Sequence, residues 1–280
     1  MKNIMHHSKF IIAATALLFA ACDKIQPEDY TVYDGASISW TASNITLDTV
    51  QRAYVEKYTG PNCSNCPDAD ATLNTAHHQF GDSLIIVTIN HRSGSQSEPY
   101  PGDEDMRTDG GNAWDEHYGI NAIPAAFINR NTDKHYLGAM PSIITDINTL
   151  LQQKPSVAIQ VSAIHHTSVD ITVDVNLLQN FSSKLTLTAL ITEDSLVYKQ
   201  NNHNVTVDDY VHNHMLRKVI TGFWGREIDC AGTAGEKLRG ALSFSPSPSI
   251  KLANSHIVVF VSDKNTRRVL NAASCRITNP

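Results

Sequence analysis

The pattern of apolar residues changes abruptly near residue 155, and this change limits the folds open to the chain more than any other feature. After Lys154-Pro155, apolar and polar residues alternate strictly in four segments, VAIQVSAI, VDITVDVNL, KLTLTALIT and HIVVFVSD. Alternation with a period of two is typical of half-buried antiparallel strands. We therefore predict that residues 156–280 form an all-β sandwich of the immunoglobulin or fibronectin type.

Residues 37–155 have a mixed pattern. A strand over 52–58 is followed by a helix over 68–80, with Pro67 in its first turn, where a missing N–H costs little. The run LIIVTIN, residues 84–90, has the composition of a fully buried strand. Strand, helix and strand make a βαβ unit, so we predict an α/β domain over 37–155. A short helix over 112–118, the strands AAFIN and KHYL, and a helix over 141–151 complete it.

The first 36 residues are predicted to direct export and anchoring. Lys2 and Lys9 precede an apolar stretch from Phe10 to Ala21. A membrane-spanning helix needs about 20 residues, so this stretch is typical of a signal peptide over 1–21. The sequence LFAAC resembles a lipobox, which implies a lipid on Cys22; an ordinary secretory cleavage site is the alternative, and both imply export. Residues 22–36 are polar and predict a flexible tether.

Export gives the other four cysteines access to an oxidising compartment, where disulfides form. Four cysteines allow three pairings. Close spacing favours Cys63 with Cys66, which leaves Cys230 to pair with Cys275. We predict the second pair to be a structural disulfide that stabilises the fold by roughly 4 kcal/mol in the chain-entropy model.

Cys63 and Cys66 also form a Cys-x-x-Cys motif that follows a strand and opens a helix. The free N–H groups and the positive end of a helix favour a thiolate, which is the attacking species in disulfide exchange. Cys63 would attack, and Cys66 would then resolve the mixed disulfide. This chemistry requires the Cys63 sulfur to be accessible.

Other chemistries have weaker support in the sequence. Cys-x-x-Cys is half of many zinc sites, but the other half is missing here. His212 and His214 would share a face of a strand and could bind a metal, although a polar patch is the simpler interpretation. The sequence contains no phosphate loop, glycine fingerprint or nucleophile elbow, so we expect no metal and no cofactor. A net charge of −6 and a pI near 6.1 argue against nucleic acid as a partner.

The segment GPNCSNCP, the strand before it and Ile123-Pro124 ahead of a strand resemble the thioredoxin fold. The wider pattern is similar to the outer membrane protein 28-related lipoproteins of Bacteroides-type bacteria. It consists of a lipobox, YVEKYTG before the dithiol, YVHNHMLRKVITGFWG and VVFVSDKNTRRVLNAAS. This resemblance covers nearly the whole chain. It implies an outer membrane lipoprotein on the periplasmic or cell-surface side.

The thioredoxin resemblance implies roles for four residues. Cys63 matches the attacking cysteine, Cys66 the resolving cysteine, and Pro124 the cis-proline that holds the backbone of an incoming chain. Glu56 lies about where thioredoxins keep a buried acidic residue for proton transfer. Burial without a cation would raise its pKa for that task, whereas an exposed Glu56 would be a solvated strand residue.

Two functions remain from the sequence. In the first, a membrane-anchored thiol-disulfide oxidoreductase exchanges disulfides with exported or surface proteins that carry cysteines. In the second, the thioredoxin-like domain is a scaffold with a structural 63–66 disulfide, and the β-sandwich binds a surface partner or ligand. We take the first as the prediction, with Cys63, Cys66, Pro124 and Glu56 as its site residues.

Overall fold

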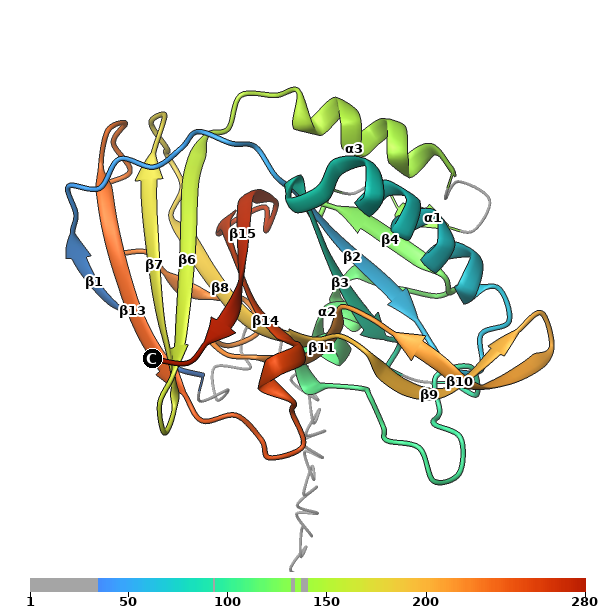
Figure 1. The fold of residues 1–280 in the computed structure, drawn as a ribbon. Coiled ribbons are helices and arrows are strands. Elements are labelled where there is room, and N and C mark those ends of the chain that lie inside the picture. Colours follow the sequence, from blue (N-terminus) through green and yellow to red (C-terminus); the bar gives the residue numbers. More distant parts are fainter. Residues whose placement is uncertain (1–34, 93, 132–133, 137–140) are drawn as a thin grey trace, which may run out of the picture. The chain divides into compact units, whose positions relative to one another are not determined.

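The computed structural model describes residues 35–92, 94–131, 134–136 and 141–280 (Figure 1). The predicted signal peptide, the predicted lipid-bearing Cys22 and nearly all of the predicted tether lie outside these residues. The described residues belong to one compact unit. Within them, no helix is both long enough and apolar enough to cross a membrane.

The first half of the described chain is built around strand β2. β2 pairs in parallel with β3 and antiparallel with β4, and β4 pairs with β5. Helices α1 and α3 lie on one face of these strands (Figure 1), and α2 packs on the other. The predicted βαβ unit is therefore confirmed. The bounds are β2 (Ala53–Thr59), α1 (Cys66–Phe80), β3 (Leu84–Asn90), α2 (Asp109–Tyr118), β4 (Ala125–Ile128), β5 (Lys134–Tyr136) and α3 (Ile143–Leu151).

Alternation along β2 divides its side chains between two cores. Ala53 and Val55 pack against α1 and α3 in one cluster with Leu73. Tyr54 and Tyr58 point to the opposite face and join a cluster that includes side chains from the second half of the chain. All seven residues of β2 are buried. A charged residue on this strand is therefore buried on one face or the other.

The second half of the described chain is almost entirely β. The four alternating segments of the sequence form β6, β7, β8 and β14, and one face of each strand contributes to a single core. The opposite faces of β8 and β14 reach the cluster that contains Tyr54 and Tyr58. The described protein is mostly β and has one large sheet. The bounds are β6 (Val157–His165), β7 (Val169–Leu177), β8 (Leu185–Glu193), β9 (Leu196–Asn202), β10 (Val205–His212), β11 (Met215–Val219), β12 (Arg226–Glu227), β13 (Lys237–Phe244), β14 (Ser255–Asp263) and β15 (Val269–Thr278).

The large sheet continues across residue 155, where we predicted a domain boundary. β11 pairs antiparallel with β8 and also lies parallel to β3, where Met215 is opposite Thr88. Near the start of the described chain, β1 (Ser39–Ala42) pairs with β13 of the β-rich half. Each half therefore contributes a strand to the sheet region of the other.

Strands β9 and β10 form a separate two-stranded sheet. We call residues 196–212 the covering hairpin. Figure 1 shows it beside the end of β2 and the start of α1. The sequence did not predict this hairpin, which brings part of the β-rich half to the predicted dithiol site.

Candidate functional site

Cys63 and Cys66 form a disulfide, with their Cα atoms 5.4 Å apart. The predicted local pairing is thus confirmed. Both cysteines lie where the chain leaves β2 and enters α1, which begins at Cys66 and has Pro67 in its first turn. Local backbone bonds shape the loop, because the Cys63 N–H donates to the Gly60 carbonyl and the Cys66 N–H to the Cys63 carbonyl.

The covering hairpin is hydrogen-bonded to this loop on both sides of Cys63. The side-chain amide of Gln200 donates to the carbonyl oxygens of Cys63, at 3.1 Å, and Gly60, at 3.2 Å. The backbone N–H of Asn201 donates to the Pro61 carbonyl at 2.7 Å, and that of His203 donates to the Ser64 carbonyl at 2.9 Å. These bonds hold β9 along the dithiol loop in the manner of a paired strand edge.

A second segment holds the opposite side of the loop. The Asn62 N–H donates to the Gln96 carbonyl at 2.9 Å, and the Asn62 side chain donates to the Glu98 carbonyl at 2.7 Å. Between the two segments, Cys63 is 1% exposed and Cys66 is fully buried. The access to Cys63 that disulfide exchange requires is absent in this conformation.

Pro124 lies at the same end of the sheet. The Ile123–Pro124 peptide bond is cis, and Pro124 is buried. Tyr58 of β2 is opposite Ala125 of β4, so Pro124 comes beside the last residue of β2, where the dithiol loop begins. The structure therefore brings Pro124, Cys63 and Cys66 to one end of β2, as the sequence predicted.

Glu56, to which the thioredoxin resemblance gave a role in proton transfer, does not join them. Its side chain is fully buried on the face of β2 that carries Tyr54 and Tyr58, away from α1. Arg130 donates to it twice, at 2.7 and 2.8 Å, and the Tyr54 hydroxyl donates at 2.9 Å. The Arg130 guanidinium also lies 4.3 Å from the ring centre of Trp114. Glu56 is thus buried with a cation, an arrangement that the sequence analysis did not consider.

Lys57 is the ionisable residue of β2 on the α1 side. Its side chain is 4% exposed and forms an ion pair with Asp70 of α1. Asp70 lies one helical turn after Cys66, and it also accepts a hydrogen bond from Tyr210 of the covering hairpin at 2.8 Å. Burial lowers the pKa of Lys57 to about 7. The alternation of side chains along β2 could have predicted this position of Lys57, because residues 53, 55 and 57 share a face of the strand.

Cys230 and Cys275 are free cysteines, so the predicted structural disulfide between them is wrong. Cys275 is opposite Ile257 of β14, which is in turn opposite Ile191 of β8. Cys230 follows Ile228, which is hydrogen-bonded to Leu185 at the other end of β8. Six residues of strand separate these positions by about 20 Å, whereas bridged Cα atoms are about 5.5 Å apart. The pairing rested on elimination, which carries no geometric information.

The histidine pair of the sequence does not share a strand face. His212 ends β10, but His214 has a left-handed backbone with φ of 58°. Burial lowers the pKa of each to about 4. Among the residues that the structure describes, no group of three or more His, Cys, Asp or Glu side chains has the geometry to hold a metal ion.

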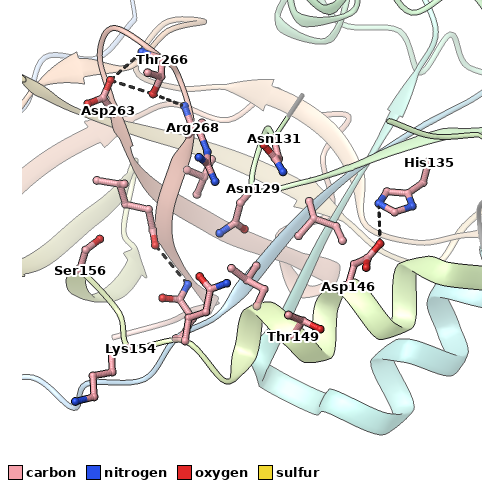
Figure 2. A pocket seen from close by; sticks show the side chains of 16 residues that line it. Asn129, Asn131, His135, Asp146, Thr149, Lys154, Ser156, Asp263, Thr266 and Arg268 are labelled. Carbon is pink, nitrogen blue, oxygen red and sulfur yellow. Dashed lines mark hydrogen bonds and ion pairs between the residues drawn. The ribbon is translucent and has the colours of Figure 1, made fainter. Parts of the chain in front are cut away.

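The described residues also form a polar groove of about 640 Å³ (Figure 2), between the end of α3 and the turn from β14 to β15. Asp146 lies 3.5 Å from the ring of His135 on one wall. The carboxylate of Asp263 on the other wall is occupied by the turn that follows it. Arg268 and Lys154 line the groove without a side-chain partner among the described residues. The groove is open and could take a polar ligand.

Comparisons with known proteins place the chain in a family. A family model described as outer membrane protein Omp28 matches residues 111–279. No protein with a curated description matches the sequence. Among solved structures, HBP35 of Porphyromonas gingivalis has 14% sequence identity and a TM-score of 0.67, over 84% of this chain and 78% of that chain.

A protein of Agrobacterium tumefaciens has 15% identity and a TM-score of 0.53, over 81% of this chain and 95% of that chain. Likenesses at this identity show a shared fold alone. A domain of the outer membrane lipoprotein Omp28 from Porphyromonas gingivalis has 21% identity and a TM-score of 0.32, over 45% of this chain and 90% of that chain. Because the family model matches more than half of the sequence, this protein belongs to the Omp28 family of outer membrane lipoproteins.

Proposed function

We propose that this protein is a non-catalytic binding lipoprotein in which the first half is a thioredoxin-like scaffold and the Cys63–Cys66 disulfide is structural. The thioredoxin-like assignment is supported by the order of β2, α1, β3, α2, β4, β5 and α3, by the dithiol at the start of α1, and by Pro124 at the same end of the sheet. Its anchor would be a lipid on Cys22, as the lipobox implies. Its partners would be surface or exported molecules.

The observation that carries this proposal is the cover over the disulfide. An exchange reaction begins with a thiolate approaching a sulfur in line with the disulfide bond, but Cys63 is 1% exposed, and β9 and residues 96–98 are hydrogen-bonded to the loop that carries it. Three donor groups of the covering hairpin make four hydrogen bonds to carbonyl oxygens of the dithiol loop. The disulfide closes a short ring that contains two of those carbonyls, those of Cys63 and Ser64. Its role in this arrangement is to present a rigid loop to the hairpin.

The experiment is a reduction and trapping assay on the full chain in detergent, in a Cys230→Ser, Cys275→Ser background that removes the free thiols. The native protein is incubated with an excess of a water-soluble phosphine for increasing times, with and without denaturant. The phosphine is then removed, and the thiols that have formed are labelled with a maleimide. We expect labelling of Cys63 and Cys66 to be at least a hundredfold slower without denaturant. We also expect no catalysed reduction of a test protein disulfide by a dithiol donor. Catalysed reduction that is lost in Cys63→Ala would overturn the proposal.

A second function is favoured by one observation, namely that the cover on the Gln200 side is a separate two-stranded sheet. If the hairpin swings away, the same dithiol becomes a gated thiol-disulfide oxidoreductase that acts on exported proteins with cysteines. Cys63 would attack, Cys66 would resolve and Pro124 would hold the incoming backbone. The assay separates the two functions, because a gated enzyme would show turnover once a substrate or partner displaces the hairpin.

A further inference from the structure

A second cavity, of about 450 Å³, lies on the far side of β3 from β2. Its floor is the first half of β3, residues 84–86, and His77 from the end of α1 borders it. The opposite wall comes from the β-rich half, with His256 and Val258 of β14 and residues 274–276 of β15. The cavity therefore opens where the large sheet separates around β3.

The edge of β3 in this cavity has no neighbouring strand. β2 pairs with all seven residues of β3 on one side, whereas on the other side β11 pairs with Thr88 alone. The Thr88 N–H donates to the His214 carbonyl at 2.7 Å, which shows that the backbone groups of Thr88 point away from β2. Since this direction alternates along a strand, the backbone groups of Ile86 and Leu84 point the same way.

Three of these groups have no partner among the described residues. The Leu84 N–H donates to the Gly81 carbonyl. The Leu84 carbonyl and both backbone groups of Ile86 remain unpaired on the cavity side, although Leu84 is only 2% and Ile86 only 5% exposed. Buried backbone groups without partners are rare in folded proteins, because each costs the free energy of a lost hydrogen bond. The Leu84 carbonyl, the Ile86 N–H and the Ile86 carbonyl therefore present an acceptor, a donor and an acceptor along the strand. This order matches the hydrogen-bonding groups of the main chain of an added strand.

Side chains around the cavity also lack partners. The Nδ1 atom of His77 is buried and has no hydrogen-bond partner. Arg52 and Arg276 line the cavity, and neither guanidinium has an acceptor among the described residues. His214 and His256 are each 3.3 Å from the carboxylate of Asp194, so that carboxylate already has partners on the cavity wall. Asp82 also lines the cavity, on the exposed turn before β3, so the two arginines are the groups left to receive an acidic side chain.

From these observations we propose that the cavity binds an extended peptide segment, which adds as a strand to the free edge of β3 and places an acidic side chain at Arg52 and Arg276. Main-chain hydrogen bonds to Ile86 and Leu84 would supply affinity, and the two arginines would supply sequence preference. A volume of 450 Å³ is within the usual range for ligand sites, about 300–1,000 Å³. The proposal gives the binding function proposed above a site and rests on that function.

The groove of Figure 2 is the competing location, and it lacks these features. It is larger, but the polar groups that line it at Asp263 and Gln51 are already used by the surrounding chain. Arg268 and Lys154 line it with exposed side chains, as Arg276 does in the cavity beside β3. It therefore supplies a matched control position for the test.

The test uses the full chain in detergent and a random heptapeptide library, from which bound peptides are selected, synthesised and titrated. We expect saturable binding by peptides with a Glu or Asp at a fixed position. Methylating the backbone nitrogens of the peptide that face β3 should weaken binding at least tenfold. Methylating the alternate nitrogens, which face away from β3, should weaken binding much less. Bound peptide should also slow hydrogen exchange of the Ile86 amide at least tenfold, as measured by NMR.

Variants locate the site. Arg276→Gln should remove the preference for the acidic residue and weaken binding about tenfold, whereas Arg268→Gln should change nothing. A library that yields no saturable peptide, binding that survives methylation in both registers, or an Ile86 amide that exchanges at an unchanged rate would overturn the proposal. Weakening by Arg268→Gln instead of Arg276→Gln would overturn it too, because it would place the peptide in the other groove.

The outcome is independent of the disulfide assay. Loss of peptide binding with an inert Cys63 would remove this site and leave the disulfide structural. Catalysed disulfide reduction by the native protein, with peptide binding intact, would overturn the non-catalytic function and leave the site in place.

Discussion

Glu56 and Lys57 follow one another on β2, both are buried, and their charges are neutralised in opposite ways. Glu56 meets Arg130 inside a core of aromatic rings drawn from both halves of the chain. Lys57 meets Asp70, whose side chain is 23% exposed, and the remaining bond to Asp70 comes from the covering hairpin. The first pair is therefore sealed inside the core, while the second is partly exposed and held in part by the covering hairpin. A conformation in which the covering hairpin leaves the dithiol loop would also break the Tyr210–Asp70 bond on the Lys57 side.

The largest effect is expected where the permanent pair is broken. Arg130→Met leaves Glu56 buried without a cation, which should lower the free energy of unfolding by about 3–5 kcal/mol. Urea denaturation of the two proteins measures it. Lys264→Met is the control, because Lys264 pairs with Glu227 where both side chains are exposed, and its loss should be much smaller. A loss at Arg130 as small as that of the control would show that Glu56 is stabilised by other means.

Removing one tyrosine hydroxyl next to each ion pair tests the difference between the Glu56 and Lys57 sides of β2 more finely. Tyr54→Phe deletes a buried donor to Glu56 and should cost about 1.5–3 kcal/mol, the range for bonds to a charged group. Tyr210→Phe deletes the donor to Asp70 and should cost about 1 kcal/mol, because water can replace it. Both values come from urea denaturation. Equal losses would contradict the view that the Lys57 side is the looser one.

The hairpin itself can be loosened with one substitution. Gln200→Ala removes the side-chain donor shared by Gly60 and Cys63, worth about 1.4 kcal/mol, so reduction of the Cys63–Cys66 disulfide by a phosphine should become about tenfold faster. Gln160→Ala, at an exposed position of β6, is the control and should leave the rate unchanged. An unchanged rate in Gln200→Ala would mean that the segment at residues 96–98 limits access.

The smallest expected effect is a pH dependence. Burial lowers the pKa of Lys57 from 10.5 to about 7, so between these values the unfolded chain carries a proton that the folded protein lacks. Stability contributed at this position is therefore lowest below pH 7 and rises with pH. The gain between pH 6 and pH 7 should be about 0.4 kcal/mol. It should be absent in Lys57→Met, and a wild-type stability that falls over this range relative to Lys57→Met would contradict the assignment.

Local patterns predicted much of the fold. The strand at residues 84–90 and the helix after Pro67 follow from composition and period, and the close spacing of Cys63 and Cys66 correctly paired them. The four alternating segments form strands as expected. Export signals and long-range resemblance correctly placed the chain among outer membrane lipoproteins.

Contacts between residues far apart in the sequence were not predictable in this way. Arg130 is 74 residues from Glu56, and nothing near either residue marks the pair. The hairpin sequence, VYKQNN and VTVDDYVH, alternates imperfectly because one face is exposed and the other follows an irregular loop. The dithiol is therefore recognisable from its spacing, but its burial is a property of a segment some 140 residues later.

Strand β11 makes the two halves mutually dependent, because it hydrogen-bonds to β8 on one edge and meets β3 on the other. A fragment ending near residue 155 would lose the neighbour of β3 together with the cover of the disulfide. The complementary fragment would carry a detached hairpin with Val197, Val205 and Val211 already exposed. Unpaired strand edges and exposed valines favour aggregation. Studies of the separate halves would mainly measure the effects of their newly exposed strand edges. Point substitutions in the intact chain avoid this problem.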